Sequence, residues 1–138
     1  MIQDKTQLVR DGLETAYIDG NIASEISYKP GFVSNNHREG KKVISVIENE
    51  LLKCDKFQIS VAFITLGGVT PLLQTLKELE RKGVPGEILT SNYLDFSEPL
   101  ALEKLHSLKN IKIRMYDTRS ANNGFHTKGY IFREEEIY

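Results

Sequence analysis

Two kinds of hydrophobic periodicity alternate along the chain from Lys41 onward, and this alternation restricts the possible folds more than any other feature. Between 41 and 54 the apolar residues recur at intervals of three and four, which is typical of an amphipathic helix. Residues 57–64 alternate with a period of two, which predicts a strand. A second helix is predicted over 67–83, because it opens at a Gly-Gly and Thr-Pro turn and ends at a glycine.

The same alternation continues to the end of the chain. It predicts a strand over 87–91, a helix over 97–108 and further strands over 111–116 and 125–132. Both faces of segment 57–64 are apolar or small, as expected of a central strand that is covered on both sides. Strands that alternate with helices predict an α/β fold, with a mostly parallel sheet and helices on both faces.

The first 38 residues have much weaker periodicity. A short helical pattern, formed by Leu8, Leu13 and Ala16, gives way to a polar stretch rich in turn formers. We therefore expect residues 1–38 to be an appendage or linker, and 39–138 to be the folded domain. The final letters REEEIY resemble a turn followed by the start of a strand at Ile137–Tyr138. This pattern predicts a fragment whose domain continues beyond the given sequence.

Composition excludes several classes of protein. With 138 residues, 40% of them hydrophobic, the chain can bury a core without disulfides, and a lone Cys54 suits a reducing compartment. We find no apolar run of membrane-spanning length and no signal peptide, so we expect a cytoplasmic protein with no membrane association. One cysteine and three scattered histidines give no metal-ligand spacing, and Gly67-Gly68 lacks a nucleotide motif. We therefore expect neither a metal nor a cofactor.

Charge is distributed unevenly. The chain carries 18 basic and 19 acidic residues, a net charge of -1, but the segment from Leu102 to Arg133 has seven basic and two acidic residues, a charge of +5. An anionic substrate is expected to meet this segment, and Arg114 and Arg119 are candidates for binding it. Asn92 and Tyr93 are further candidates, because they follow a strand end, where α/β proteins bind ligands.

The segment Phe125 to Phe132 carries the strongest chemical signal. A strand period of two places His126 and Lys128 on one face, roughly 6.5 to 7 Å apart. An imidazole can attack phosphorus while an adjacent ammonium binds the non-bridging oxygens, so the pair suits phosphoryl chemistry. The same spacing is also compatible with two exposed positions on an edge strand.

The context of this pair resembles the phospholipase D superfamily. The likeness covers about Val33 to Phe132 and rests on TSNYLDFSEPLALEKL before a basic strand and FHTKGYIF after a loop. It is greatest to the phospholipase-D-like domain of bacterial helicase and restriction-type proteins. The family signature is His-x-Lys-x4-Asp with a downstream Gly-Ser-x-x-Asn. Here Arg133 stands at the Asp position, followed by three glutamates, and the chain ends before the second element.

The resemblance implies a phosphodiesterase or nuclease that acts on nucleic acid, with DNA preferred over RNA, as the N-terminal module of a DNA helicase or restriction-type protein. His126 would then form a phosphohistidine or protonate the leaving oxygen, and Lys128 would bind phosphate. Such sites use two His-x-Lys sets, which a homodimer or a second copy in a longer parent protein would supply. His37 and His106 are expected to be surface residues. The alternative is a non-catalytic DNA-binding or docking module of a helicase.

Overall fold

The structure is a computed structural model that describes residues 31–135, and the chain divides into two compact units, Met1–Val43 and Ile44–Tyr138. The helical pattern expected near Leu8 and the strand expected at Ile137–Tyr138 lie outside the described residues. In the first unit, the described part contains the 3-10 helix η2 (His37–Glu39). Asn36 caps this helix by accepting hydrogen bonds from two backbone N–H groups.

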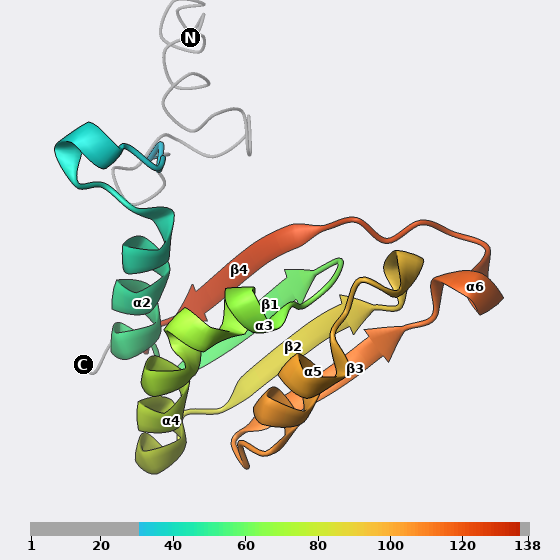
Figure 1. Ribbon diagram of the computed structural model, residues 1–138. Coiled ribbons are helices and arrows are strands. Elements are labelled where there is room, and N and C mark those ends of the chain that lie inside the picture. Colours follow the sequence, from blue (N-terminus) through green and yellow to red (C-terminus); the bar gives the residue numbers. More distant parts are fainter. Residues whose placement is uncertain (1–30, 136–138) are drawn as a thin grey trace, which may run out of the picture. The chain divides into compact units, whose positions relative to one another are not determined.

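Helices and strands alternate along the rest of the chain, as the periodicity predicts (Figure 1). The elements are α2 (Val43–Lys53), β1 (Lys56–Val61), α3 (Leu66–Val69), η3 (Thr70–Leu72), α4 (Leu73–Lys82), β2 (Gly86–Ser91), η4 (Tyr93–Asp95), α5 (Pro99–His106), β3 (Ile111–Tyr116), α6 (Thr118–Ala121) and β4 (Lys128–Arg133). Within 31–135, no helix has both the length and the apolar character that crossing a membrane requires.

The strands form one sheet with the order β3-β2-β1-β4. Strands β1, β2 and β3 are parallel, and β4 is antiparallel to β1. The predicted α/β class with a mostly parallel sheet is therefore confirmed, and β1 is a central strand. Because β4 runs in the opposite direction, it begins beside the carboxyl ends of the three parallel strands.

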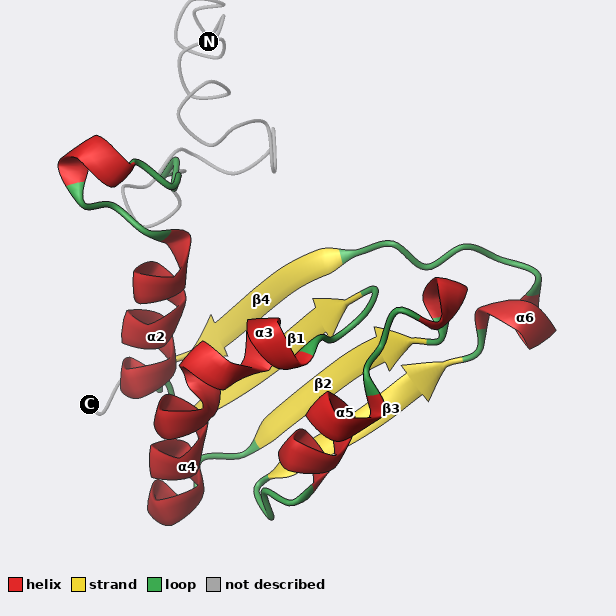
Figure 2. Cartoon of the chain, in the orientation of Figure 1, coloured by secondary structure: helices red, strands yellow, loops and turns green. Residues whose placement is uncertain are grey.

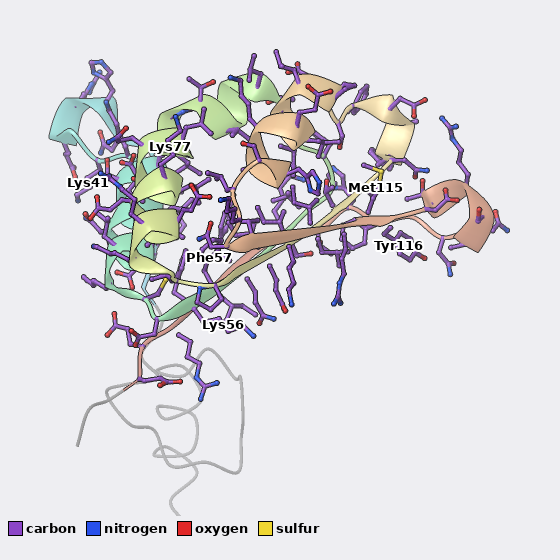
Figure 3. All side chains as sticks on the ribbon, turned by 90° about the horizontal axis from the view of Figure 1, so that it is seen from below. Lys41, Lys56, Phe57, Lys77, Met115 and Tyr116 are labelled. Atoms are coloured by element: carbon purple, nitrogen blue, oxygen red, sulfur yellow. The ribbon has the colours of Figure 1, made fainter. Side chains whose placement is uncertain are left out.

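Helices α3, α4 and α5 lie over one face of the sheet, and the core is between them and that face (Figures 1 and 3). In Figure 3, Phe57 and Met115 lie on the helix side, whereas Lys56 and Tyr116 point away from the helices. The core consists of buried aliphatic and aromatic residues: Leu51, Cys54, Phe57, Ile59, Ile64, Val69, Leu76, Leu79, Ile88, Ala101, Leu105, Leu108 and Ile111.

Helices on both faces were expected, but the described helices cover only one. The opposite face of β1 carries Gln58 and Ser60, which are exposed and half-buried. The small apolar residues that suggested a second covered face are Ala62 and Ile64, and they lie in the loop after β1. Both are buried there by loop packing, which gives the same sequence pattern as burial in a strand. We refer to the uncovered side as the open face.

Candidate functional site

His126 and Lys128 lie side by side at the start of β4. Lys128 is the first residue of the strand, and His126 precedes it in the connecting loop, so the strand is shorter than the predicted 125–132. The Nζ atom of Lys128 is 3.2 Å from the Nε2 atom of His126. Both residues are exposed. The two groups therefore share one side of the backbone and are accessible to a ligand.

Thr127, between them, explains this orientation. The backbone N–H of Ala62 donates to the Thr127 carbonyl at 3.0 Å, and the Ser60 and Thr127 hydroxyls are 2.7 Å apart. Thr127 is thus bonded to β1 through backbone and side chain, with its hydroxyl beside Ser60 on the open face. Because successive side chains alternate, His126 and Lys128 project toward the helix side, where Lys128 is paired with Val61.

The hydrogen bond between the two side chains fixes their chemical roles. A charged ammonium has three donors and no acceptor, so Lys128 donates and the Nε2 atom of His126 accepts. The ring proton of a neutral His126 is then on Nδ1. Once Lys128 transfers its hydrogen bond to a ligand, the Nε2 lone pair is chemically able to attack a phosphate group.

The pair is located at the carboxyl ends of the parallel strands. The loop from α6 to β4 crosses the sheet along that edge and carries His126 (Figure 2). In open α/β sheets ligands bind at the carboxyl ends of the parallel strands. The fold therefore places the pair where such proteins commonly bind ligands.

Two aromatic rings lie beside the pair, and a third packs against both of them. The Tyr93 ring is 5.4 Å from the His126 ring, and Lys128 Nζ is 6.0 Å from the Phe63 ring centroid. Phe96 packs edge-to-face against Phe63 at 5.5 Å and against Tyr93 at 6.3 Å. Tyr93 was a sequence-based candidate, and the structure brings it to the pair. Phe63 and Phe96 were missed, although Phe63 ends the period-two pattern of 57–63.

Two serines, one buried and one half-buried, join the loops that carry these rings. Ser91, fully buried, donates to the Ala62 carbonyl at 2.7 Å and accepts from the Tyr93 N–H at 3.2 Å. Ser97 donates to the Ser91 carbonyl at 3.0 Å and accepts from the Ile64 N–H at 3.3 Å. The end of β1 is thereby fixed to the end of β2. A polar residue at the end of an apolar strand is the sequence signal for this network.

Asn92 connects the loop after β2 to the loop after β3. Its amide nitrogen donates to Asp117 at 2.6 Å, and its amide oxygen accepts from the backbone N–H and the hydroxyl of Thr118. Hydrogen bonds from the Ser120 hydroxyl, Asn92 and the Arg119 N–H lower the pKa of Asp117 to about 2. The amide of Asn92, a predicted substrate-binding group, is thus engaged in holding these loops together.

The two candidate arginines lie in different places. Arg119 forms an ion pair with Asp95 and lines a shallow hollow of about 530 Å³ together with Asn92 and Tyr93. Arg114 is paired with Leu89 on the open face, on the other side of the sheet from Lys128. The structure therefore brings His126, Lys128 and Tyr93 together, places Asn92 and Arg119 beside them, and separates Arg114 from them.

The basic bias of the C-terminal third is divided between the two sides of the sheet. The open face carries four basic side chains, those of Lys56, Lys112, Arg114 and Arg133. Among the described strand residues of that face, Glu87 has a carboxylate. A hydrogen bond from Gln58, followed by the charge of Lys56, lowers the pKa of Glu87. Arg133, at the expected Asp position, points away from the pair and lies 3.9 Å from Glu135.

Neither of the other histidines belongs to the strand or loop that carries the pair. His106 is exposed at the end of α5, on the side that leads into the start of β3, and His37 belongs to the first unit. Among the described residues, no group of three His, Cys, Asp or Glu side chains could hold a metal ion. Comparison of the sequence with protein-family models gives no match, and neither does a search of curated proteins.

Proposed function

We propose that this chain carries one half of a phosphodiesterase site that acts on DNA, in which His126 is the nucleophile and Lys128 binds the phosphate. The observation that supports this most directly is the 3.2 Å contact between two exposed groups of complementary chemistry. Their place at the carboxyl edge of a parallel sheet adds support. The resemblance to phospholipase-D-like domains suggests a helicase or restriction-type parent protein.

The proposed reaction has two steps. The Nε2 atom of His126 attacks phosphorus, an N–P bond forms, and the P–O bond to the leaving DNA strand breaks. Lys128 moves its hydrogen bond from Nε2 to a non-bridging oxygen and offsets the charge of the transition state. Water then hydrolyses the phosphohistidine, which releases the phosphate-bearing strand and regenerates the imidazole.

The leaving oxygen needs a proton, and a second imidazole is suited to donate it. In a homodimer with twofold symmetry, His126 of a second copy supplies this acid, and each copy exchanges roles with the other. A second His-x-Lys set in a longer parent protein would serve equally.

Covalent trapping tests the proposal. The chain is incubated with an oligonucleotide labelled at the scissile phosphate, in the presence of a chelator, and quenched without acid. We expect the label on His126 and none on the His126→Ala variant. His106→Ala is the matched control, because it removes another exposed histidine. If His126→Ala still cleaves DNA or retains the label, His126 is not the nucleophile.

The open face favours a second candidate, a module that binds DNA without cleaving it. Four cations and one carboxylate on a single sheet face form a positive surface that suits the phosphate backbone. In this case Lys112→Ala with Arg114→Ala reduces DNA affinity and its salt dependence, whereas His126→Ala leaves affinity unchanged. The phosphodiesterase proposal predicts loss of cleavage from His126→Ala with the open face intact.

A further inference from the structure

The loop between β2 and α5 exposes apolar side chains beside the His126–Lys128 pair. Phe96 is 50% exposed, and its ring contacts those of Phe63 and Tyr93. Single exposed apolar residues are common on protein surfaces. Here, however, the exposed ring belongs to a cluster that reaches both members of a candidate phosphate site, through Tyr93 to His126 and through Phe63 to Lys128.

The backbone of this loop is strained. Leu94 and Asp95 have φ angles of 47° and 55°, in the left-handed region that side-chain-bearing residues rarely adopt. Backbone bonds from Asp95 N–H to the Asn92 carbonyl and from Phe96 N–H to the Tyr93 carbonyl hold the turn, as does the ion pair of Asp95 with Arg119. Strain of this kind persists where the surrounding structure maintains it, often at binding sites. Its result here is that Tyr93 and Phe96 flank the turn and meet ring to ring.

We propose that Phe96, supported by Tyr93 and Phe63, stacks on an unpaired nucleobase of single-stranded DNA whose neighbouring phosphate is held by Lys128 beside the Nε2 atom of His126. This inference rests on the proposed function and names the form of its substrate. Aromatic side chains that alternate with cations bind single strands without sequence preference, because every base has a π-face. In a duplex the bases are stacked within the helix, so a phosphate at Lys128 leaves the Phe96 ring without a base.

Binding measurements on the full chain test this. Fluorescence anisotropy at fixed ionic strength compares three probes of equal length: a single-stranded DNA oligonucleotide, its duplex, and an abasic single strand. We expect the base-bearing single strand to bind most tightly. Phe96→Leu keeps an apolar side chain but removes the π-face. It should lower the affinity for the base-bearing strand by about tenfold and leave the affinity for the abasic strand almost unchanged. Leu100→Ala is the control, because Leu100 is 52% exposed, similar to Phe96.

Each outcome distinguishes this inference from the proposed function. Lys128→Ala should lower the affinity for the base-bearing strand and for the abasic strand alike. If it changes neither affinity, the proposed phosphate site is wrong. If Lys128→Ala weakens both but Phe96→Leu weakens neither, the stacking inference is overturned and the phosphate site stands. The stacking inference is also overturned if Phe96→Leu weakens both strands equally, or if the duplex binds as tightly as the single strand.

Discussion

The Lys128 ammonium donates a hydrogen bond of 3.2 Å to the Nε2 atom of His126 at the start of β4, where both side chains are exposed. The contact exists because Thr127 is bonded to β1 on the opposite face. The contact has consequences for the ring that can be measured without any assay of activity.

We first predict the tautomer of His126. Because which ring nitrogen is protonated depends on the hydrogen bond that the other makes, a neutral His126 should carry its proton on Nδ1. Nitrogen NMR of labelled protein above the titration range of histidine distinguishes the two tautomers. Lys128→Met should shift the population toward Nε2–H at His126 and leave His106 unchanged. An Nε2–H signal from His126 in the unsubstituted protein would contradict the geometry.

The second prediction concerns stability in acid. Hydrogen bonds to Asp117 lower its pKa to about 2, from an ordinary value of 3.8. The folded state thus favours the charged form, so this stabilisation is complete above pH 3.8 and is lost as the pH falls through 2. Asp117→Asn should lower the free energy of unfolding at neutral pH, and its difference from the unsubstituted protein should shrink in that window.

Urea denaturation at a series of pH values measures this difference. Glu103→Gln, an exposed substitution on α5, is the control and should give a parallel curve. The assignment is wrong if the Asp117→Asn difference stays constant from neutral pH down to pH 2.

The third prediction contrasts two strand glycines. A Cβ atom on Gly86 would lie 2.1 Å from the Cζ atom of Phe57, whose side chain is fully buried. Gly86→Ala must therefore displace a core ring, and we expect a loss of about 1–3 kcal/mol in the free energy of unfolding. An added Cβ at Gly129 would meet no atom within 4 Å, so Gly129→Ala should change stability by about 0.5 kcal/mol or less. Equal midpoints in urea for the two variants would refute this packing argument.

Local periodicity explains which parts of the fold could be predicted. The strand predicted over 111–116 matches β3, and the one predicted over 87–91 differs from β2 by one residue. Segment 57–64 was predicted too long, because Ala62 and Ile64 are buried by loop contacts rather than in a strand. The helix predicted over 67–83 is divided into α3, η3 and α4, with Pro71 in the central 3-10 turn.

The candidate site was predictable only where it depends on neighbours in sequence. The common side of His126 and Lys128 follows from a period of two, which is a local property. Which other side chains lie on the same face as His126 and Lys128 depends on the register of β4 against β1, where Lys128 opposes Val61. No local pattern encodes that register, so Arg114 was grouped with the pair although it lies on the open face. The hydrogen bond that occupies the Asn92 amide is likewise not a local property, because its partner Asp117 is 25 residues away in the sequence.

Adjacent residues at the end of β2 provide the fourth prediction. Thr90 and Ser91 are both fully buried hydroxyl residues. Ser91 donates to the Ala62 carbonyl and accepts from the Tyr93 N–H, whereas the Thr90 hydroxyl has no hydrogen-bond partner among the described residues. An unpaired buried hydroxyl destabilises a fold, and a paired one leaves its partners unsatisfied when it is removed.

The two substitutions should therefore act in opposite directions. Thr90→Val keeps the shape of the side chain and removes the unpaired group, so the free energy of unfolding should stay equal or rise by about 1 kcal/mol. Ser91→Ala should lower it by about 1–3 kcal/mol, because the Ala62 carbonyl and the Tyr93 N–H lose a partner. Ser91→Ala should also loosen the Tyr93 ring from His126, visible as a change in the NMR shifts of the His126 ring. A larger loss from Thr90→Val than from Ser91→Ala would show that Thr90 has a partner after all.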